Sequence, residues 1–235
     1  MALNKEVFKT RALTALIFVA VMLVGLLWNG YSFVALISII ICGSVYEIIK
    51  IGKLIKGNDW QKYLPIGIVY AVMLIFFIDL GFNKLPSTNS AAGDNIINAY
   101  NYILPFGVIL SIWINDTMAY LVGSFIGKTP FSKISPKKTW EGTIGGALLC
   151  VIIIGLLGYF LPIAQSLAVV HWVAIGFICA IFGTLGDLLE SKIKRTANIK
   201  DSGTFMPGHG GFLDRFDSLL IAAPVVWIYF KVFVL

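Results

Sequence analysis

Acidic, basic and glycine residues are mixed in two short stretches of this sequence, at 128–141 and 186–217. A segment that only anchors a protein to anionic lipid would be basic without the acids. In the second stretch, Glu190 and Lys194 follow Asp187 by three and seven residues, so the three side chains share one face of a continuous helix. Basic side chains bind phosphate oxygens and carboxylates bind divalent cations, so the mixture predicts a site for phosphate chemistry.

A further group of charges, Asp214, Arg215 and Asp217, stands near the end of the same stretch, just before an apolar run. Two helix ends can bring Asp214 and Asp187 toward each other. Converging carboxylates suit Mg²⁺, a hard cation that takes oxygen ligands and usually brings substrate phosphates. The alternative is a solvated rim in which these acids pair with neighbouring lysines.

A turn rich in glycine lies between the two charged groups. Residues 206–211 read Met-Pro-Gly-His-Gly-Gly, a composition that forbids a regular helix. Backbone N–H groups in such a turn can form an anion-binding nest, although a flexible linker between two helices would have the same composition. His209 could donate to a phosphate or orient a ligand, or it could be structural. The flanking basic residues that could hold phosphate oxygens are Lys194, Arg195, Lys200 and Arg215.

Single polar residues inside apolar runs are further candidates. Asp116 lies within the apolar run 102–126, where a carboxylate is either functional or held by a hydrogen bond between helices. Glu47 is a weaker candidate, because it lies near the end of its run and close to bulk water. Trp140 in the first polar stretch could stack on a base, but packing against the protein is the simpler interpretation.

The elements that position these residues are expected to be membrane-spanning helices. Of the 235 residues, 58% are hydrophobic and 13% are charged, whereas soluble domains carry about 25% charged residues. Runs of roughly 20 apolar residues can cross a bilayer. We therefore predict an all-α polytopic membrane protein with about seven spans, or more if short and broken helices are counted, near residues 12–28, 31–49, 63–80, 102–126, 142–161, 168–189 and 218–235. The length predicts one domain, 1–235, with N-terminal helices at 1–100 and a catalytic portion at 101–235.

The distribution of basic residues predicts the orientation. With seven spans, all but two of the 18 Lys and Arg residues lie on one side of the membrane, the exceptions being Lys84 and Lys231. The positive-inside rule predicts that the side with most of the Lys and Arg residues is cytoplasmic. The N-terminus and both polar stretches are therefore expected in the cytoplasm. This topology signal also accounts for the net charge of +6, so no nucleic-acid partner is needed.

Residues 191–217 resemble the signature of a known enzyme family. They read Ser-Lys-Ile-Lys-Arg, then after four residues Lys-Asp, and further on Pro-Gly-His-Gly-Gly and Leu-Asp-Arg-Phe-Asp. This pattern is similar to the signature of the phosphatidate cytidylyltransferases, also called CDP-diacylglycerol synthases. The segments 116–120, 135–142 and 186–191 look like this family as well. The resemblance therefore covers the C-terminal half of the chain, and the N-terminal spans are compatible with it.

The resemblance implies a Mg²⁺-dependent transfer of a cytidylyl group from CTP to phosphatidic acid, which gives CDP-diacylglycerol and pyrophosphate. It also implies that Asp187 and Asp214 hold the metal, with a monovalent cation such as K⁺ as a second candidate ion. A homodimer in the plasma (inner) membrane is expected, with the active site facing the cytoplasm. The catalytic candidates are Asp187, Asp214, Lys194, Arg195, Lys200, Asp201, His209, Arg215 and Asp217. The candidates for binding substrate phosphate are Ser135, Lys137, Lys138, Gly208, Gly210 and Gly211, and the supporting candidates are Asp116, Glu141, Glu190 and Ser191.

Two other functions remain as alternatives. A CTP-dependent kinase acting on a polyprenol-type lipid alcohol would use the same phosphate-handling groups but release CDP, and the long signature argues against it. A membrane transporter would place polar residues near mid-membrane on several helices. In this sequence Asp116 is the one plausible deep charge, and the other charges collect at one surface.

Overall fold

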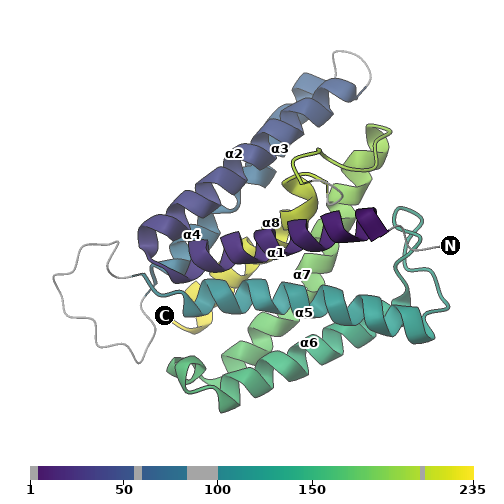
Figure 1. Cartoon of the computed structure of the whole chain (residues 1–235). Coiled ribbons are helices and arrows are strands. Elements are labelled where there is room, and N and C mark those ends of the chain that lie inside the picture. Colours follow the sequence, from purple (N-terminus) through teal and green to yellow (C-terminus); the bar gives the residue numbers. More distant parts are fainter. Residues whose placement is uncertain (1–4, 56–59, 84–99, 207–209) are drawn as a thin grey trace.

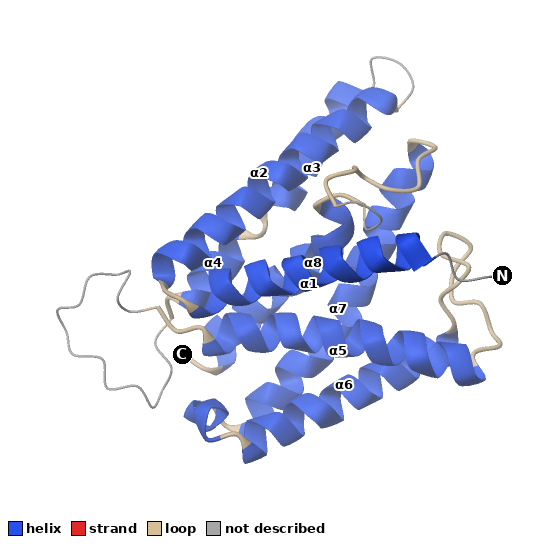
Figure 2. Cartoon of the chain, viewed as in Figure 1, coloured by secondary structure: helices blue, strands red, loops and turns tan. Residues whose placement is uncertain are grey.

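The computed structural model describes residues 5–55, 60–83, 100–206 and 210–235, and over these residues the protein is built from helices without strands (Figure 1; Figure 2). A 3₁₀ helix, η2 (Pro162–Ser166), joins α6 to α7. The α-helices are α1 (Lys5–Leu27), α2 (Gly30–Leu54), α3 (Trp60–Val72), α4 (Ile75–Gly81), α5 (Ile103–Ile126), α6 (Trp140–Phe160), α7 (Val169–Thr196) and α8 (Leu213–Phe233).

The prediction of an all-helical polytopic membrane protein is confirmed. Five helices of the described part, α2, α5, α6, α7 and α8, are long and apolar enough to cross a membrane. They correspond to five of the predicted spans. The shorter apolar helical stretches at 12–27 and 67–81 correspond to the other two.

The predicted span at 63–80 is divided between α3 and α4. Met73 and Leu74 form a turn between these helices. Around this turn the N–H groups of Phe76 and Phe77 donate to the carbonyls three residues earlier, at 3.2 and 3.0 Å. Such bonds wind the backbone more tightly than an α-helix does. Neither Gly nor Pro marks this point in the sequence, so the apolar pattern predicted one continuous span.

The helices form a packed bundle with an apolar exterior. Helices α5, α6 and α7 pack on one another and α7 packs along α8, while α2 packs with α1 and α3 and α4 contacts α8. Phe33 and Phe77 are fully buried, and their ring centroids lie 5.8 Å apart. By contrast, Phe125 and Leu16 are 84% and 68% exposed. Large apolar side chains on the outside are expected where the surroundings are lipid.

One end of the bundle collects the polar segments. In Figure 1 the beginning of α1, the loop between α5 and α6, and the segment that follows α7 lie at one end, whereas η2 and the C-terminus lie at the other. This is the grouping that the basic residues predicted. Which side of a membrane this end faces stays a prediction, as does the division of the chain at residue 100.

Candidate active site

Helix α7 carries the predicted row of polar side chains on one face. The helix continues past residue 189, the predicted end of its span, to Thr196. Ser191 Oγ donates to Asp187 Oδ1 at 3.2 Å, and Lys194 Nζ lies 2.6 Å from Glu190 Oε2. Glu190 is fully buried, and Lys194 is its one ion-pair partner in the described part of the chain. This lysine therefore offsets the cost of burying the carboxylate.

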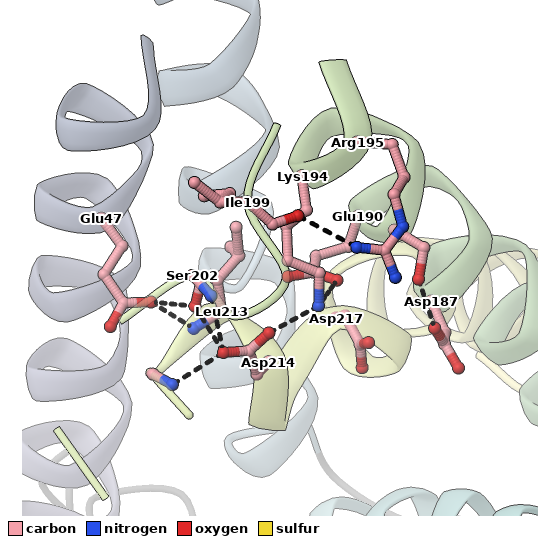
Figure 3. A network of polar contacts seen from close by, with 12 residues as sticks. Glu47, Asp187, Glu190, Lys194, Arg195, Ile199, Ser202, Leu213, Asp214 and Asp217 are labelled. Atoms are coloured by element: carbon pink, nitrogen blue, oxygen red, sulfur yellow. Dashed lines mark hydrogen bonds and ion pairs between the residues drawn. The ribbon is translucent and has the colours of Figure 1, made fainter. Parts of the chain in front are cut away.

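Asp214 lies in the first turn of α8, and donors surround its carboxylate (Figure 3). Lys194 Nζ donates to Oδ1 at 2.6 Å, and the N–H groups of Ser202 and Gly211 donate to Oδ2 at 2.8 and 2.7 Å. The position also suits a negative charge because the helix dipole is positive at its N-terminus. Asp214 thus joins α7, the segment after it and α8 in one network.

Two residues with positive φ, Asn198 and Gly210, shape the described part of the segment between α7 and α8. Asn198 has a φ of 56°, and the N–H of Ile199 bonds back to the last turn of α7 at 3.0 Å, which is a common way for a helix to end. Farther along, the N–H of Met206 donates to the carbonyl of Gly210 at 2.9 Å. Gly210 has a φ of 85°, and a Cβ there would overlap the Asp214 side chain, so this turn requires glycine.

Glu47 of α2 binds the same segment, although the sequence presented it as a weak candidate. Its Oε2 accepts from Ser202 Oγ at 2.6 Å and from the N–H of Leu213 at 2.9 Å, and its Oε1 accepts from the N–H of Phe212 at 2.9 Å. The residue is 4% exposed. The sequence signal was a single acid near the end of an apolar run, but its partners lie at least 155 residues later. Ser202 was not predicted at all.

The first polar stretch forms a closed loop between α5 and α6. The N–H of Phe131 donates to the carbonyl of Lys138 at 2.8 Å. The Glu141 carboxylate accepts from the N–H and the hydroxyl of Thr129, at 3.1 and 2.8 Å, and so fixes the start of the loop. The ring of Trp140 packs edge-on against Phe131 with centroids 4.5 Å apart. One side of Trp140 therefore packs against the loop, while 49% of the residue stays exposed.

Lys138 connects this loop to α7. Its ammonium group forms an ion pair with Asp187, whose side chain remains 28% exposed. Asp116 of α5 and Asp217 of α8 lie within electrostatic range of Asp187. Three acids from three helices therefore interact with one another, and Lys138 pairs with one of them. The excess of negative charge around Asp187 favours an added cation there.

The predicted phosphate-binding basic residues divide into two sets. Lys138 and Lys194 are paired with carboxylates. Their charge is therefore already partly neutralised. Four others are exposed and form no ion pair within the described residues, namely Lys137, Arg195, Lys200 and Arg215. The second set is available to bind an anion.

The remaining predicted residues have smaller roles in the described contacts. The carbonyl of Ser135 accepts from the N–H of Lys138 at 3.1 Å, which tightens the loop between α5 and α6. Asp201 is exposed. Gly208 and His209 lie outside the described residues, so their roles stay predictions.

The predicted metal-binding acids differ in how well they suit a cation. Among the described residues, no group of three or more His, Cys, Asp or Glu side chains forms a ready metal site. The predicted pair, Asp187 and Asp214, contacts two different lysines, Lys138 and Lys194. Asp187 fits an added cation better than Asp214 does, because it is partly exposed and has other acids near it, whereas the Asp214 oxygens already accept several hydrogen bonds.

The fold and the site define an all-helical polytopic membrane protein with a charged site at one end of its helices. Comparison with known proteins gives the family. The family described as "Cytidylyltransferase family" matches residues 95–233, which is more than half of the chain. The chain belongs to this family, and the resemblance found in the sequence is confirmed.

Relatives of the chain include proteins named phosphatidate cytidylyltransferase. The chain is 38% identical over 161 residues to that of Staphylococcus aureus (strain COL), which covers 67% of this chain and 56% of the relative. It is 48% identical over 116 residues to phosphatidate cytidylyltransferase 4, chloroplastic, of Arabidopsis thaliana, covering 49% of this chain and 29% of the relative. The chain thus spans little more than half the length of the bacterial relative and less of the plant one.

Proposed function

We propose that this protein transfers a cytidylyl group from CTP to phosphatidic acid, and so supplies CDP-diacylglycerol for phospholipid biosynthesis. One observation carries the proposal. Exposed cations lie in the same polar segments as the ion-paired acids Asp187 and Asp214, at one end of an apolar helical bundle. These cations and the two aspartates all belong to the segment that matches the family. A site in this position can take one substrate from the lipid and the other from water.

The reaction brings two polyanions together, and the exposed cations suit that task. A phosphate oxygen of phosphatidic acid attacks the α-phosphorus of CTP, the bond from that phosphorus to the oxygen bridging to the β-phosphate breaks, and pyrophosphate leaves. The attacking oxygen is already ionised, so it needs little help from a base. Fixed positive charges lower the repulsion and stabilise the charge that develops on pyrophosphate. The residues proposed to bind the phosphates directly are Lys137, Arg195, Lys200 and Arg215.

We propose Mg²⁺ as the cofactor, held by Asp187 and Asp214, with a monovalent cation such as K⁺ as a second candidate ion. The acids gathered around Asp187 support this directly. Asp214 supports it less directly, because Lys194 and two backbone N–H groups already donate to its oxygens. Mg²⁺ bound there would neutralise phosphate charge and stabilise the leaving group.

We further propose that the protein is a homodimer in the plasma membrane, with the polar end facing the cytoplasm, where CTP is available. The distribution of Lys and Arg supports the orientation. The dimer follows from the family resemblance. Light scattering of the protein in a mild detergent tests it, and a protein mass of one chain would contradict it.

The function is tested with purified protein, phosphatidic acid, Mg²⁺ and CTP labelled on its α-phosphate. The expected result is label in a chloroform-soluble lipid together with an equal amount of pyrophosphate. A parallel reaction contains CTP labelled on its γ-phosphate and a polyprenol. Transfer of the γ-label to the polyprenol, without α-label in phosphatidic acid, would replace the proposal with a lipid kinase. No labelled lipid in either reaction, from folded protein, would overturn both.

A further inference from the structure

We propose that Glu47 is a positioning residue whose carboxylate holds Ser202, Phe212 and Leu213, and with them Asp214, in the arrangement that binds the phosphates of CTP. Glu47 lies on α2, outside the segment 95–233 that matches the family. The kinetic part of this inference rests on the proposed function. The structural part rests on the contacts of the Glu47 side chain (Figure 3).

The first contact of Glu47 completes the N-terminus of α8. The first N–H groups of a helix have no partner within it and need an acceptor from elsewhere. The side chain of Phe212, the residue before α8, makes no capping hydrogen bond. Instead, Glu47 accepts from the N–H groups of Phe212 and Leu213, both at 2.9 Å. The carboxylate also interacts favourably with the positive end of the helix dipole. Helix α2 therefore caps α8 and fixes where it starts.

The second contact links Glu47 to Asp214 through one hydroxyl group. Ser202 Oγ lies 2.6 Å from Glu47 Oε2 and 2.9 Å from Asp214 Oδ2. A serine hydroxyl has one hydrogen, so it donates to one of the two carboxylates at a time. Ser202 is 3% exposed, which keeps water from replacing it. A change at Glu47 therefore affects Asp214 through one buried side chain, that of Ser202.

Two glycines leave the space that the Glu47 carboxylate fills. A Cβ on Gly203 or on Gly211 would overlap Glu47, and for Gly211 the three nearest atoms all belong to that side chain. Of the described glycines, Gly210 alone has a positive φ, so the backbone at Gly211 would accept alanine. Glycine is therefore required at 211 because of Glu47. The contact can be tested by changing either residue.

The kinetic test compares Glu47→Gln with Asp79→Asn, a matched carboxylate-to-amide change at the other end of α8. Asp79 accepts from Trp227 Nε1 at 2.6 Å, so it also attaches α8 to a neighbouring helix. In Glu47→Gln the KM for CTP should rise at least about tenfold, the lower end of what the loss of a hydrogen bond to a charged group costs. The KM for phosphatidic acid should stay unchanged. Asp79→Asn should alter neither. A KM for CTP equal to that of the wild type, or equal rises for both substrates, would overturn the proposal.

A second test needs no activity and so separates this inference from the proposed function. Trypsin can cut after Lys200 in one polar segment and after Lys133 in the other. Glu47→Gln should speed cleavage at Lys200 about tenfold and leave Lys133 unchanged, because opening of a segment follows the free energy that holds it closed. Glu141→Gln should speed cleavage at Lys133 and leave cleavage at Lys200 unchanged. Unchanged cleavage at Lys200 would refute the role of Glu47, whereas a wild type without transferase activity would refute the proposed function alone.

A double-mutant cycle tests the contact itself, and its single variant Gly211→Ala remains a test if Glu47→Gln does not fold. Gly211→Ala should raise the KM for CTP in the wild type, because the new methyl group meets Glu47. In a Glu47→Ala background the same change should add little, since the space is then free. Additive effects, or a Gly211→Ala variant with the wild-type KM, would show that Glu47 does not set the position of this segment.

Discussion

The ammonium group of Lys194 lies 2.6 Å from an oxygen of Asp214, and it lies at the same distance from an oxygen of Glu190. The two acids are 7% and 0% exposed at their side chains, so they depend on this one cation for neutralisation. Since Glu190 and Lys194 belong to α7 and Asp214 belongs to α8, the lysine is also an electrostatic link between the two helices. The sequence predicts that Lys194 binds substrate phosphate, and the structure shows that it also links the two helices.

Replacing Lys194 should therefore cost stability. Lys194→Met leaves buried acids without their partner, and we expect the free energy of unfolding to fall by about 3–5 kcal/mol. Denaturation of the protein in detergent measures it. The control is Lys192→Met, at an exposed position on the same helix, where a change within about 0.5 kcal/mol is expected. Glu190→Gln should recover part of the loss in the Lys194→Met background. Equal stabilities of the two lysine variants would contradict this account.

Removing either proposed metal-binding acid should abolish turnover without preventing membrane insertion. We expect Asp187→Asn and Asp214→Asn to lower kcat at least about 100-fold, the range found when groups that stabilise developing charge are removed. A Mg²⁺ titration of the residual activity should need more metal for Asp187→Asn than for the wild type. Near-normal activity, with an unchanged Mg²⁺ requirement, in either variant would rule out its role in binding the metal.

The membrane helices could be predicted from the sequence because long apolar runs indicate them directly. The order of α5 to α8 and their approximate ends follow from runs that exceed the thickness of a bilayer. The break between α3 and α4 could not be predicted in this way. It depends on local bonds at Met73 and Leu74, and no Gly or Pro indicates it.

The site could be predicted where its contacts are local along the chain. Asp187, Glu190 and Lys194 share a face of α7 because helical spacing requires it, and the structure confirms this. The contact of Glu47 with Ser202 joins residues 155 positions apart. Neither apolar periodicity nor residue type indicates which distant side chains are in contact. The role of Glu47 therefore required the three-dimensional structure.

Two neighbouring lysines in the loop between α5 and α6 should behave differently. Lys137 is exposed, whereas Lys138 pairs with Asp187 near two other acids. Lys137→Gln should raise the KM for CTP a few-fold with kcat unchanged, and added salt should reduce the difference from wild type, because exposed charges are screened. Lys138→Gln should lower kcat and change the Mg²⁺ requirement. Steady-state kinetics at two salt concentrations measure both, and identical profiles would contradict the division of the basic residues into two sets.

The orientation can be tested by labelling single cysteines in intact cells. The chain has free cysteines at Cys42, which is exposed, and at Cys150 and Cys179, which are buried, so a Cys42→Ser background is suitable. Lys133 and Gln165 are both exposed and lie in the connections at opposite ends of α6. The positive-inside rule predicts that a maleimide unable to cross membranes labels Gln165→Cys in intact cells and labels Lys133→Cys after permeabilisation. The reverse pattern would place the charged site outside the cell, away from CTP, and would contradict both the orientation and the proposed use of that nucleotide.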